Sequence, residues 1–501
     1  MSSNGKVSQK LGLVSLILMI FTSVYGFNNM PRSFFLMGYA AIPWYILSAI
    51  TFFIPFAFMM AEYGAAFKNE RGGIFSWMEK SVGPRYAFIA TFMWYASNII
   101  WMVNVSSGIW VVVSNAIFGK DTTKAWSLFG LSTPKTLGIL AVCWIIFVTF
   151  TATRGLDKIK KITSVGGTAV AGLNIVLIVG ALLVFFGNGG QLAQPLNFAV
   201  SPNPKYTGSL VSVFSFLVFA IFAYGGIEVV GGLVDQTENP EKTFPKGIAI
   251  SAIVIAIGYS IGIFCVGMFT NWQTVLSVKG VHMGNVGYVI MNNLGFQLGT
   301  AFGASEAVAV QMGNWVARYV GLSMLLALTG AFFTLSYAPL KQLIEGAPAE
   351  LWPGKMGEVK DGMPANAMKV QAVIVIVMIL LVSFGGDAVA KFFEILVAMT
   401  NVAMTIPYMF LSMAFISFKK KQHIEKPFQV FTTSGFTLIA TVIVTFTVGF
   451  ANVFAIIEPA MNGDIMTTIY SIAGPIFFGI AAIVMFSNYE RKVKASKKDV
   501  A

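Results

Sequence analysis

The sequence predicts an all-α integral membrane protein with twelve transmembrane helices. Of its 501 residues, 56% are hydrophobic and only 11% are charged, and the mean hydropathy is +0.76. A soluble domain is about 45–50% apolar and about 25% charged. This composition therefore excludes a soluble enzyme, a disordered chain and a coiled coil. The apolar residues fall into long runs, and a helix needs about 20 such residues to cross a hydrocarbon core.

Twelve apolar runs are long enough to be spans, with boundaries good to a few residues. They lie near 11–37, 39–66, 86–118, 135–153, 162–187, 208–234, 246–271, 312–340, 367–384, 388–417, 430–456 and 467–488. The stretch Val281–Thr300 is too short and too rich in Gly and Asn to span, so we expect a short helix on an outer loop. Spans 1–5 (11–187) and 6–10 (208–417) form two blocks of five, and spans 11 and 12 (430–489) follow.

Basic residues indicate the orientation of the chain. With the N-terminus inside, 25 of the 33 Lys and Arg residues fall in inner segments and 5 in outer loops. The positive-inside rule then predicts that both termini are cytoplasmic. The net charge of +12 is interpreted as an inner belt that faces anionic membrane lipid, not as a nucleic-acid-binding face. The first apolar run has no clear cleavage site and is expected to be a retained helix.

Reactive residues are sparse in this chain. Cys143 and Cys265 lie inside apolar runs, where a thiol usually serves as a small hydrophobe, and His282 and His423 lie in loops. No pattern of metal ligands or of a nucleophile with its base is present. We therefore predict no metal, no cofactor and no enzymatic activity.

Two predicted spans are interrupted in their middles by residues that weaken a helix. Span 1 contains the stretch 21–31 (FTSVYGFNNMP), and span 6 contains the stretch 220–229 (AIFAYGGIEV). In a membrane, freed N–H and C=O groups are tolerated only against protein or a wet cavity. An isolated glycine usually serves helix packing. A matched pair of breaks, at the openings of two five-helix blocks, instead indicates a transporter binding site.

Such breaks suit a zwitterionic ligand. A half-helix that begins at the break in span 1 would aim free N–H groups and a positive dipole end at a carboxylate. Carbonyl groups released near Phe222–Tyr224 would accept from an ammonium group, and Ser23 adds a hydroxyl. The rings of Tyr25, Phe222 and Tyr224 are either gates with a cation–π surface or packing residues.

Charged and amide side chains within spans are costly and are candidates for coupling or gating. Glu228, one turn past the break in span 6, either titrates during the cycle or holds the broken backbone. Arg318 in span 8 snorkels to the interface, pairs with Glu228, or contacts substrate or a gate. Fixed charges are so few that a substrate without net charge is favoured, and Arg318 is the deep cation expected for any dicarboxylate.

Four further polar residues lie within or at the ends of predicted spans. Glu394 is expected to pair with Lys391 at i,i+3, and a gating role is the alternative. Asn98 and Asn104 in span 3 are either hydrogen-bonding contacts between helices or ligands. Glu62, near the inner end of span 2, is expected at the membrane interface.

Several motifs resemble the amino acid/polyamine/organocation transporter superfamily and, within it, the bacterial glutamate:GABA antiporter family. They are 61–63 (AEY), 72–77 (GGIFSW), 83–85 (GPR), 225–228 (GGIE), 238–242 (ENPEK) and Pro245. The resemblance covers nearly the whole chain. It implies a LeuT-like fold of two inverted five-helix repeats plus two C-terminal helices. It also implies alternating access around a midplane site between spans 1, 3, 6, 8 and 10.

Site residues also follow from this resemblance. The substrate carboxylate would meet Ser23, Val24, Tyr25 and Gly26. The amino end would meet Phe222, Ala223 and Tyr224 beside Gly225 and Gly226, with Phe222 at the aromatic gate position and Glu228 at the acidic position after the break. The chain departs from the family where Val24-Tyr25-Gly26 replaces Gly-x-Gly. It also has no lysine in the middle of span 5, which leaves exchange or sodium coupling open beside proton coupling.

The predicted function is secondary transport of an amino acid or related amine, by antiport or symport, across the bacterial cytoplasmic membrane. A proton or sodium ion is the candidate coupling ion, and the protein is expected to be a monomer or a homodimer. A transporter-like sensor that binds an amino acid without moving it is the alternative. The longest hydrophilic stretch, near 341–369, is short for an output domain.

Overall fold

The computed structural model describes residues 11–70, 73–153, 157–230, 234, 237–360 and 363–498. Gly72 of the 72–77 motif and residues 231–233 of predicted span 6 lie outside the described residues. The described residues form an all-helical bundle with isolated β-bridges and no strands. This confirms the predicted all-α membrane class, because ten segments are long and apolar enough to cross a membrane.

Nine helices coincide with predicted spans 3, 4, 5, 7, 8, 9, 10, 11 and 12. They are α6 (Pro84–Phe118), α7 (Thr133–Ala152), α8 (Asp157–Gly187), α10 (Pro240–Phe269), α12 (Glu306–Gly346), α13 (Ala365–Ser383), α14 (Val389–Lys420), α15 (Ser434–Met461) and α16 (Ile465–Lys498). The tenth segment runs from Asn29 to Ala66. The count of twelve spans therefore stays a prediction.

The first predicted span is divided into two helices. Helix α1 (Leu13–Val24) is separated from α2 (Asn29–Met37) by four non-helical residues. The chain then turns at Gly38, whose φ of +57° suits a glycine. Beyond this turn the second span is formed by α3 (Ala41–Ser48), a π-helical turn and α4 (Ile54–Ala66).

The sixth predicted span ends early as a regular helix. Helix α9 (Leu210–Ala223) has 14 residues, fewer than the about 20 needed to span, and irregular turns follow it. Helix α11 (Val286–Ala301) confirms the short helix expected within Val281–Thr300, and it packs against α8 and α12. A short helix, α5 (Ile74–Ser81), packs against α6 and α14.

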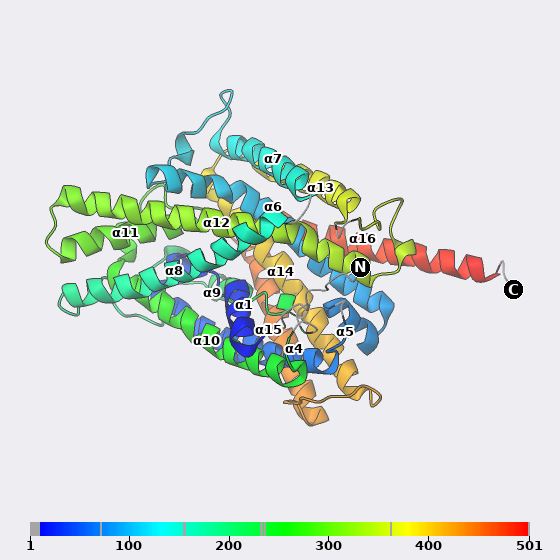
Figure 1. Cartoon of the computed structure of the whole chain (residues 1–501). Helices are drawn as coiled ribbons and strands as arrows, with labels where there is room; N and C mark the ends of the chain where they lie inside the picture. Colours follow the sequence, from blue (N-terminus) through cyan, green and yellow to red (C-terminus); the bar gives the residue numbers. More distant parts are fainter. Residues whose placement is uncertain are drawn as a thin grey trace, which may run out of the picture.

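The long helices surround the two broken ones. Helix α6 packs against both α12 and α14, and α10 packs against α1 and α4. Helices α7 and α13 lie side by side at the edge of the bundle (Figure 1). Large apolar side chains such as Phe446, Phe477 and Ile480 remain exposed on α15 and α16, as expected of a surface that faces lipid.

Candidate functional site

The two helix breaks contact each other. Gly226, in the break after α9, has a φ of +111°. A Cβ at this position would lie only 2.9 Å from the carbonyl oxygen of Ser23, at the end of α1. A glycine is therefore required here, because any side chain would be strained by the backbone conformation and would push the two breaks apart.

Tyr259 of α10 joins the two breaks through a single hydroxyl group. This oxygen accepts a hydrogen bond from the N–H of Gly26 at 2.8 Å. It lies 2.9 Å from the carbonyl oxygen of Val24 and 2.7 Å from that of Ala223, so it can donate to either. Nothing in the sequence marks Tyr259 as a site residue, since a single tyrosine in an apolar span is typical of an ordinary packing residue.

Two backbone donors just before α2 have no acceptor. Among the described residues, no oxygen accepts from the N–H groups of Phe27 or Asn28. The N–H of Gly26, in contrast, is bonded to the Tyr259 hydroxyl. The free donors at the positive end of this half-helix therefore lie one or two residues beyond the predicted segment Ser23–Gly26.

The side chains of the predicted carboxylate segment face other partners. The Ser23 hydroxyl donates to the carbonyl of Met19 within its own helix, and Val24 is buried in the core. The Tyr25 hydroxyl donates to the carbonyl of Gly258 at 2.8 Å. Tyr25 is also buried, which supports its interpretation as a packing residue between α1 and α10.

At the end of α9, some residues pack against neighbouring helices and one is accessible. The hydroxyl of Tyr224 donates to the carbonyl of Tyr45 at 3.1 Å, and its ring stacks on Phe53. A Cβ on Gly225 would overlap the hydroxyl of Tyr408. Phe222 is partly exposed at the break, so of the three predicted aromatic gates it has the most accessible ring.

Glu228 is bonded to the backbone of the break. Its side chain is buried, and its carboxylate accepts from the indole N–H of Trp94 at 3.2 Å and from the N–H of Gly226 at 3.0 Å. Both oxygens are therefore used by neutral donors from α6 and from the break itself. This geometry supports the interpretation that Glu228 holds the interrupted chain in place.

The two amides of α6 have different partners. Asn104 donates to the hydroxyl of Thr400 on α14 at 3.0 Å. It therefore forms a hydrogen-bonding contact between helices, which was the first of its two interpretations. Asn98 donates to the carbonyl of Trp94, one turn earlier in its own helix. Asn98 therefore lies beside the residue that contacts Glu228.

Arg318 lies against the C-terminal end of α6. Its guanidinium donates to the carbonyls of Ile117 and Phe118, at 3.2 and 3.4 Å, and its carbon lies 4.9 Å from the ring centre of Trp315. Among the described residues it forms no ion pair with Glu228. Cations stabilise helix C-termini, so a structural contact explains this position.

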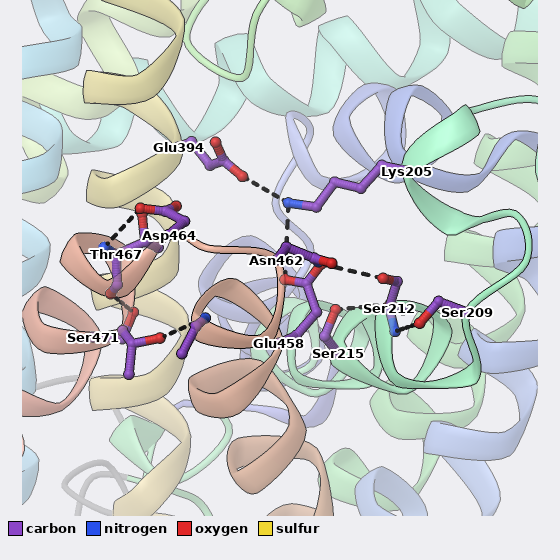
Figure 2. A network of polar contacts seen from close by, with 12 residues as sticks. Lys205, Ser209, Ser212, Ser215, Glu394, Glu458, Asn462, Asp464, Thr467 and Ser471 are labelled. Carbon is purple, nitrogen blue, oxygen red and sulfur yellow. Dashed lines mark hydrogen bonds and ion pairs between the residues drawn. The ribbon is translucent and has the colours of Figure 1, made fainter.

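Glu394 belongs to a polar network at the N-terminal end of α14. Its carboxylate is 2.6 Å from Lys205 and 3.1 Å from Lys391, which confirms the predicted i,i+3 pair. Figure 2 shows Lys205 between Glu394 and the buried Glu458, whose nearest oxygen is 4.0 Å away. Lys391 also pairs with Asp464. The network thus connects the loop before α9 to α14, α15 and α16.

The protonation of Lys205 reflects these neighbours. Burial lowers the pKa of its ammonium group, but Tyr206, Glu394 and Glu458 outweigh this effect and hold the pKa above its ordinary value. Lys205 is therefore a fixed positive charge, and the cavity of about 460 Å³ beside it is lined mostly by polar side chains of the same network.

Glu62 lies inside the protein at the inner end of predicted span 2. Its side chain is fully buried, and it accepts from Lys419 at 2.8 Å and from the N–H groups of Val430 and Phe431. A buried carboxylate needs such compensation. Lys419 lies at the C-terminal end of α14, so α14 carries ion pairs at both of its ends.

Comparisons with known proteins extend these observations. A family model described as amino acid permease matches residues 11–482. The chain is 54% identical to the inner membrane transporter YjeM of Salmonella typhimurium, over 97% of this chain and 98% of the relative. It is 24% identical to the aspartate/glutamate permease AcaP of Lactococcus lactis subsp. cremoris, over 86% and 85%. It is 22% identical to a glutamate/gamma-aminobutyrate antiporter of Lactococcus lactis subsp. lactis, over 89% and 83%.

Proposed function

Since this chain belongs to the amino acid permease family, we propose that it is a secondary transporter of an amino acid or related amine that works by alternating access. The observation that carries the proposal is the meeting of the two interrupted helices, α1–α2 and the segment after α9. Their contact at Ser23 and Gly226 brings unpaired backbone groups together inside a multi-pass membrane protein, as transporter sites do.

The carboxylate of the substrate would bind at the start of α2. The N–H groups of Phe27 and Asn28 have no acceptor among the described residues, and the helix dipole favours an anion there. This proposal extends the predicted segment Ser23–Gly26 by two residues. Tyr259 contributes by fixing Gly26 and hence the direction of the neighbouring N–H groups.

The ammonium group would bind at the break after α9. The carbonyl of Ala223 already lies within hydrogen-bonding distance of Tyr259, and that of Phe222 accepts from Gly225. The carbonyl of Tyr224 has no donor among the described residues and is the acceptor that we assign to the ammonium. The accessible ring of Phe222 would then close over the bound molecule, as the gate position requires.

Two of the ion pairs of α14 would act as gates at opposite ends of the pathway. Lys205–Glu394 connects the chain just before α9 to the start of α14, and Lys419–Glu62 connects the end of α14 to α4. Movement of the broken helices relative to α14 would open one pair at a time. Lys419–Glu62 is the buried one of the two pairs, and a buried pair favours one arrangement over another more than it adds stability.

The proposed topology is the one expected from the sequence. It has twelve spans, inverted repeats at 11–187 and 208–417, two further spans at 430–489, and both termini in the cytoplasm. The names of the relatives include aspartate, glutamate and gamma-aminobutyrate, so these are the first candidate substrates. We propose antiport or symport with a proton or sodium ion as the two coupling modes to distinguish.

Counterflow in proteoliposomes tests the proposed function. Vesicles loaded with unlabelled aspartate, glutamate or gamma-aminobutyrate should take up the labelled compound without any imposed ion gradient. Binding without counterflow would identify a sensor instead. Counterflow that needs external sodium, or that moves protons, would identify the coupling ion.

A glycine pair supplies the matched control. Gly226→Ala should abolish counterflow, because the new Cβ would lie 2.9 Å from the Ser23 carbonyl oxygen and φ is +111°. Gly386→Ala adds the same methyl group where no atom lies within 4 Å, and it should leave counterflow unchanged. Equal activity of the two variants would contradict a site at the meeting of the breaks.

A further inference from the structure

Arg32 is a cation in the first turns of α2, six residues beyond Gly26. Its side chain is partly buried, and its Nε–H donates to the carbonyl of Met283 at 3.0 Å. Among the described residues, no carboxylate lies within 4.0 Å of the guanidinium, and no acceptor is bonded to its two Nη atoms. Arg32 therefore keeps most of its hydrogen-bonding capacity unused.

A cation without an ion-pair partner is unusual in a candidate membrane span such as Asn29–Ala66. A charge placed in a membrane helix costs roughly 2.5–3.5 kcal/mol by insertion measurements, and such residues usually pair or serve function. Glu62 and Glu394 follow the rule, since each is paired with a lysine. Glu228 is compensated by two neutral donors. Arg32 differs from all three because, among the described residues, its only hydrogen-bond acceptor is the Met283 carbonyl and both Nη atoms are unbonded.

The surroundings of Arg32 offer further unused polar atoms. The hydroxyl of Tyr288 on α11 is buried, with the residue only 3% exposed, and it has no hydrogen bond of normal geometry. The Oδ1 atom of Asn28 is also buried near this hydroxyl, and among the described residues no donor is bonded to it. A Cβ on Gly287 would lie 2.6 Å from this Oδ1, so a glycine allows α11 to approach α2. The charge of Arg32 acts on the Tyr288 phenol across this small region.

The acidic group that shares this region is already occupied. Asp121 influences Tyr288 electrostatically. One of its oxygens accepts from the N–H and the hydroxyl of Thr123, and the other accepts from the amide of Asn285 at 2.8 Å. Its remaining neighbour is His282, at 3.6 Å. Asp121 thus holds the loop around it and leaves the Arg32 guanidinium free.

We propose that Arg32, with the Tyr288 hydroxyl, binds a carboxylate of the transported molecule, which makes the transporter selective for substrates with two carboxylates. The free N–H groups of Phe27 and Asn28 would hold one carboxylate, and the Nη atoms of Arg32 would hold the second in a bidentate pair. This inference rests on the proposed transport function. It replaces Arg318, whose guanidinium is bonded to the end of α6, as the cation for an anionic substrate.

Competition in counterflow measures this selectivity. In Arg32→Gln, the concentration of glutamate or aspartate that halves uptake should rise at least tenfold, while that of gamma-aminobutyrate should change less than threefold. A glutamine can still donate to the Met283 carbonyl, which preserves the structural contact. Arg32→Lys should show an intermediate loss, because an ammonium does not bind bidentately. The control Arg318→Gln should leave the ratio between the two substrates unchanged.

A direct binding measurement separates this inference from the proposed function. Glutamate and glutarate should raise the apparent Tm of the purified unmodified protein, and Arg32→Gln should remove that shift while it elutes as the same monodisperse peak. Stabilisation without counterflow would refute transport and support the Arg32 site. Equal losses for all substrates in Arg32→Gln, an unchanged ratio, or no stabilisation by either dicarboxylate would overturn the Arg32 site.

Discussion

The hydroxyl oxygen of Tyr259 lies 2.8 Å from the amide nitrogen of Gly26. This bond crosses from an uninterrupted helix, α10, to the interruption between α1 and α2. Because the same hydroxyl also lies against the carbonyl of Ala223 in the second break, one side chain fixes the relative position of both interruptions. The proposed site is therefore rigid on its α10 side.

Tyr259→Phe should impair transport far more than it impairs folding. The substitution keeps the ring but leaves the N–H of Gly26 and the Ala223 carbonyl without the hydroxyl. A buried polar group that loses its partner costs about 1–3 kcal/mol, so we expect substrate affinity to fall about tenfold in counterflow. Tyr95→Phe is the control, since Tyr95 is also buried and, in the part of the chain that the structure describes, its hydroxyl bonds to Gln371 alone. Equal effects of the two variants would contradict a special role for Tyr259.

Substitution of Glu228 distinguishes the two roles considered for it. If Glu228 holds the backbone through Trp94 and Gly226, Glu228→Gln should reduce transport several-fold, because an amide has one acceptor oxygen and its NH2 group would face the other donor. Glu228→Ala removes both acceptors and should abolish transport. The pH profile of uptake should be the same in Glu228→Gln and the unmodified protein. A glutamine variant whose uptake no longer depends on pH would instead show that the carboxyl group titrates during transport.

Removal of the charge on Glu394 should open the pathway at that end. Glu394→Gln breaks the ion pair with Lys205, so a cysteine introduced by Phe222→Cys should react several times faster with an impermeant maleimide. The experiment needs the Cys143→Ser background, because Cys143 is exposed. Asp387→Asn is the control, since this exposed acid pairs with Lys135 near the same end of α14. No acceleration, or the same acceleration in both variants, would exclude a gate at Glu394.

The loop that precedes α11 should be sensitive to acid. Burial, opposed by Asp121 and assisted by Lys124 and Arg32, lowers the pKa of His282 to about 4. The native loop thus contains a neutral imidazole, whereas the unfolded chain binds a proton near pH 6.5. The contribution of the neutral His282 to the free energy of unfolding is complete above about pH 6.5. It is lost as the pH falls toward 4, by up to about 1.4 kcal/mol per pH unit.

Hydrogen exchange of the segment 277–285 measures this effect. Exchange should accelerate as the pH falls from 6.5 to 4, after correction for the intrinsic rate. His282→Gln should remove the pH dependence, and His423→Gln, at the other and exposed histidine, should not. Unchanged protection of the segment across this range would refute the prediction.

The sequence alone determined the class of the protein, the position of its helices and the two interruptions. These properties follow from consecutive residues, because hydropathy and the helix-breaking tendency of stretches such as 25–28 and 224–226 act locally. The motifs also indicated the amino acid permease family, which the comparisons established. The pair Lys391–Glu394 was predictable for the same reason, since its members are three residues apart on one helix.

Only the tertiary structure decided which groups meet at the breaks. Tyr259 and Gly26 are 233 positions apart, and nothing in the apolar sequence of α10 marks that tyrosine. The partner of Glu62 is Lys419, 357 positions away. The contact of Arg318 with the end of α6 and the unbonded Nη atoms of Arg32 are likewise properties of the packing. Contacts between distant spans depend on how whole helices pack, and a local pattern carries no information about that packing.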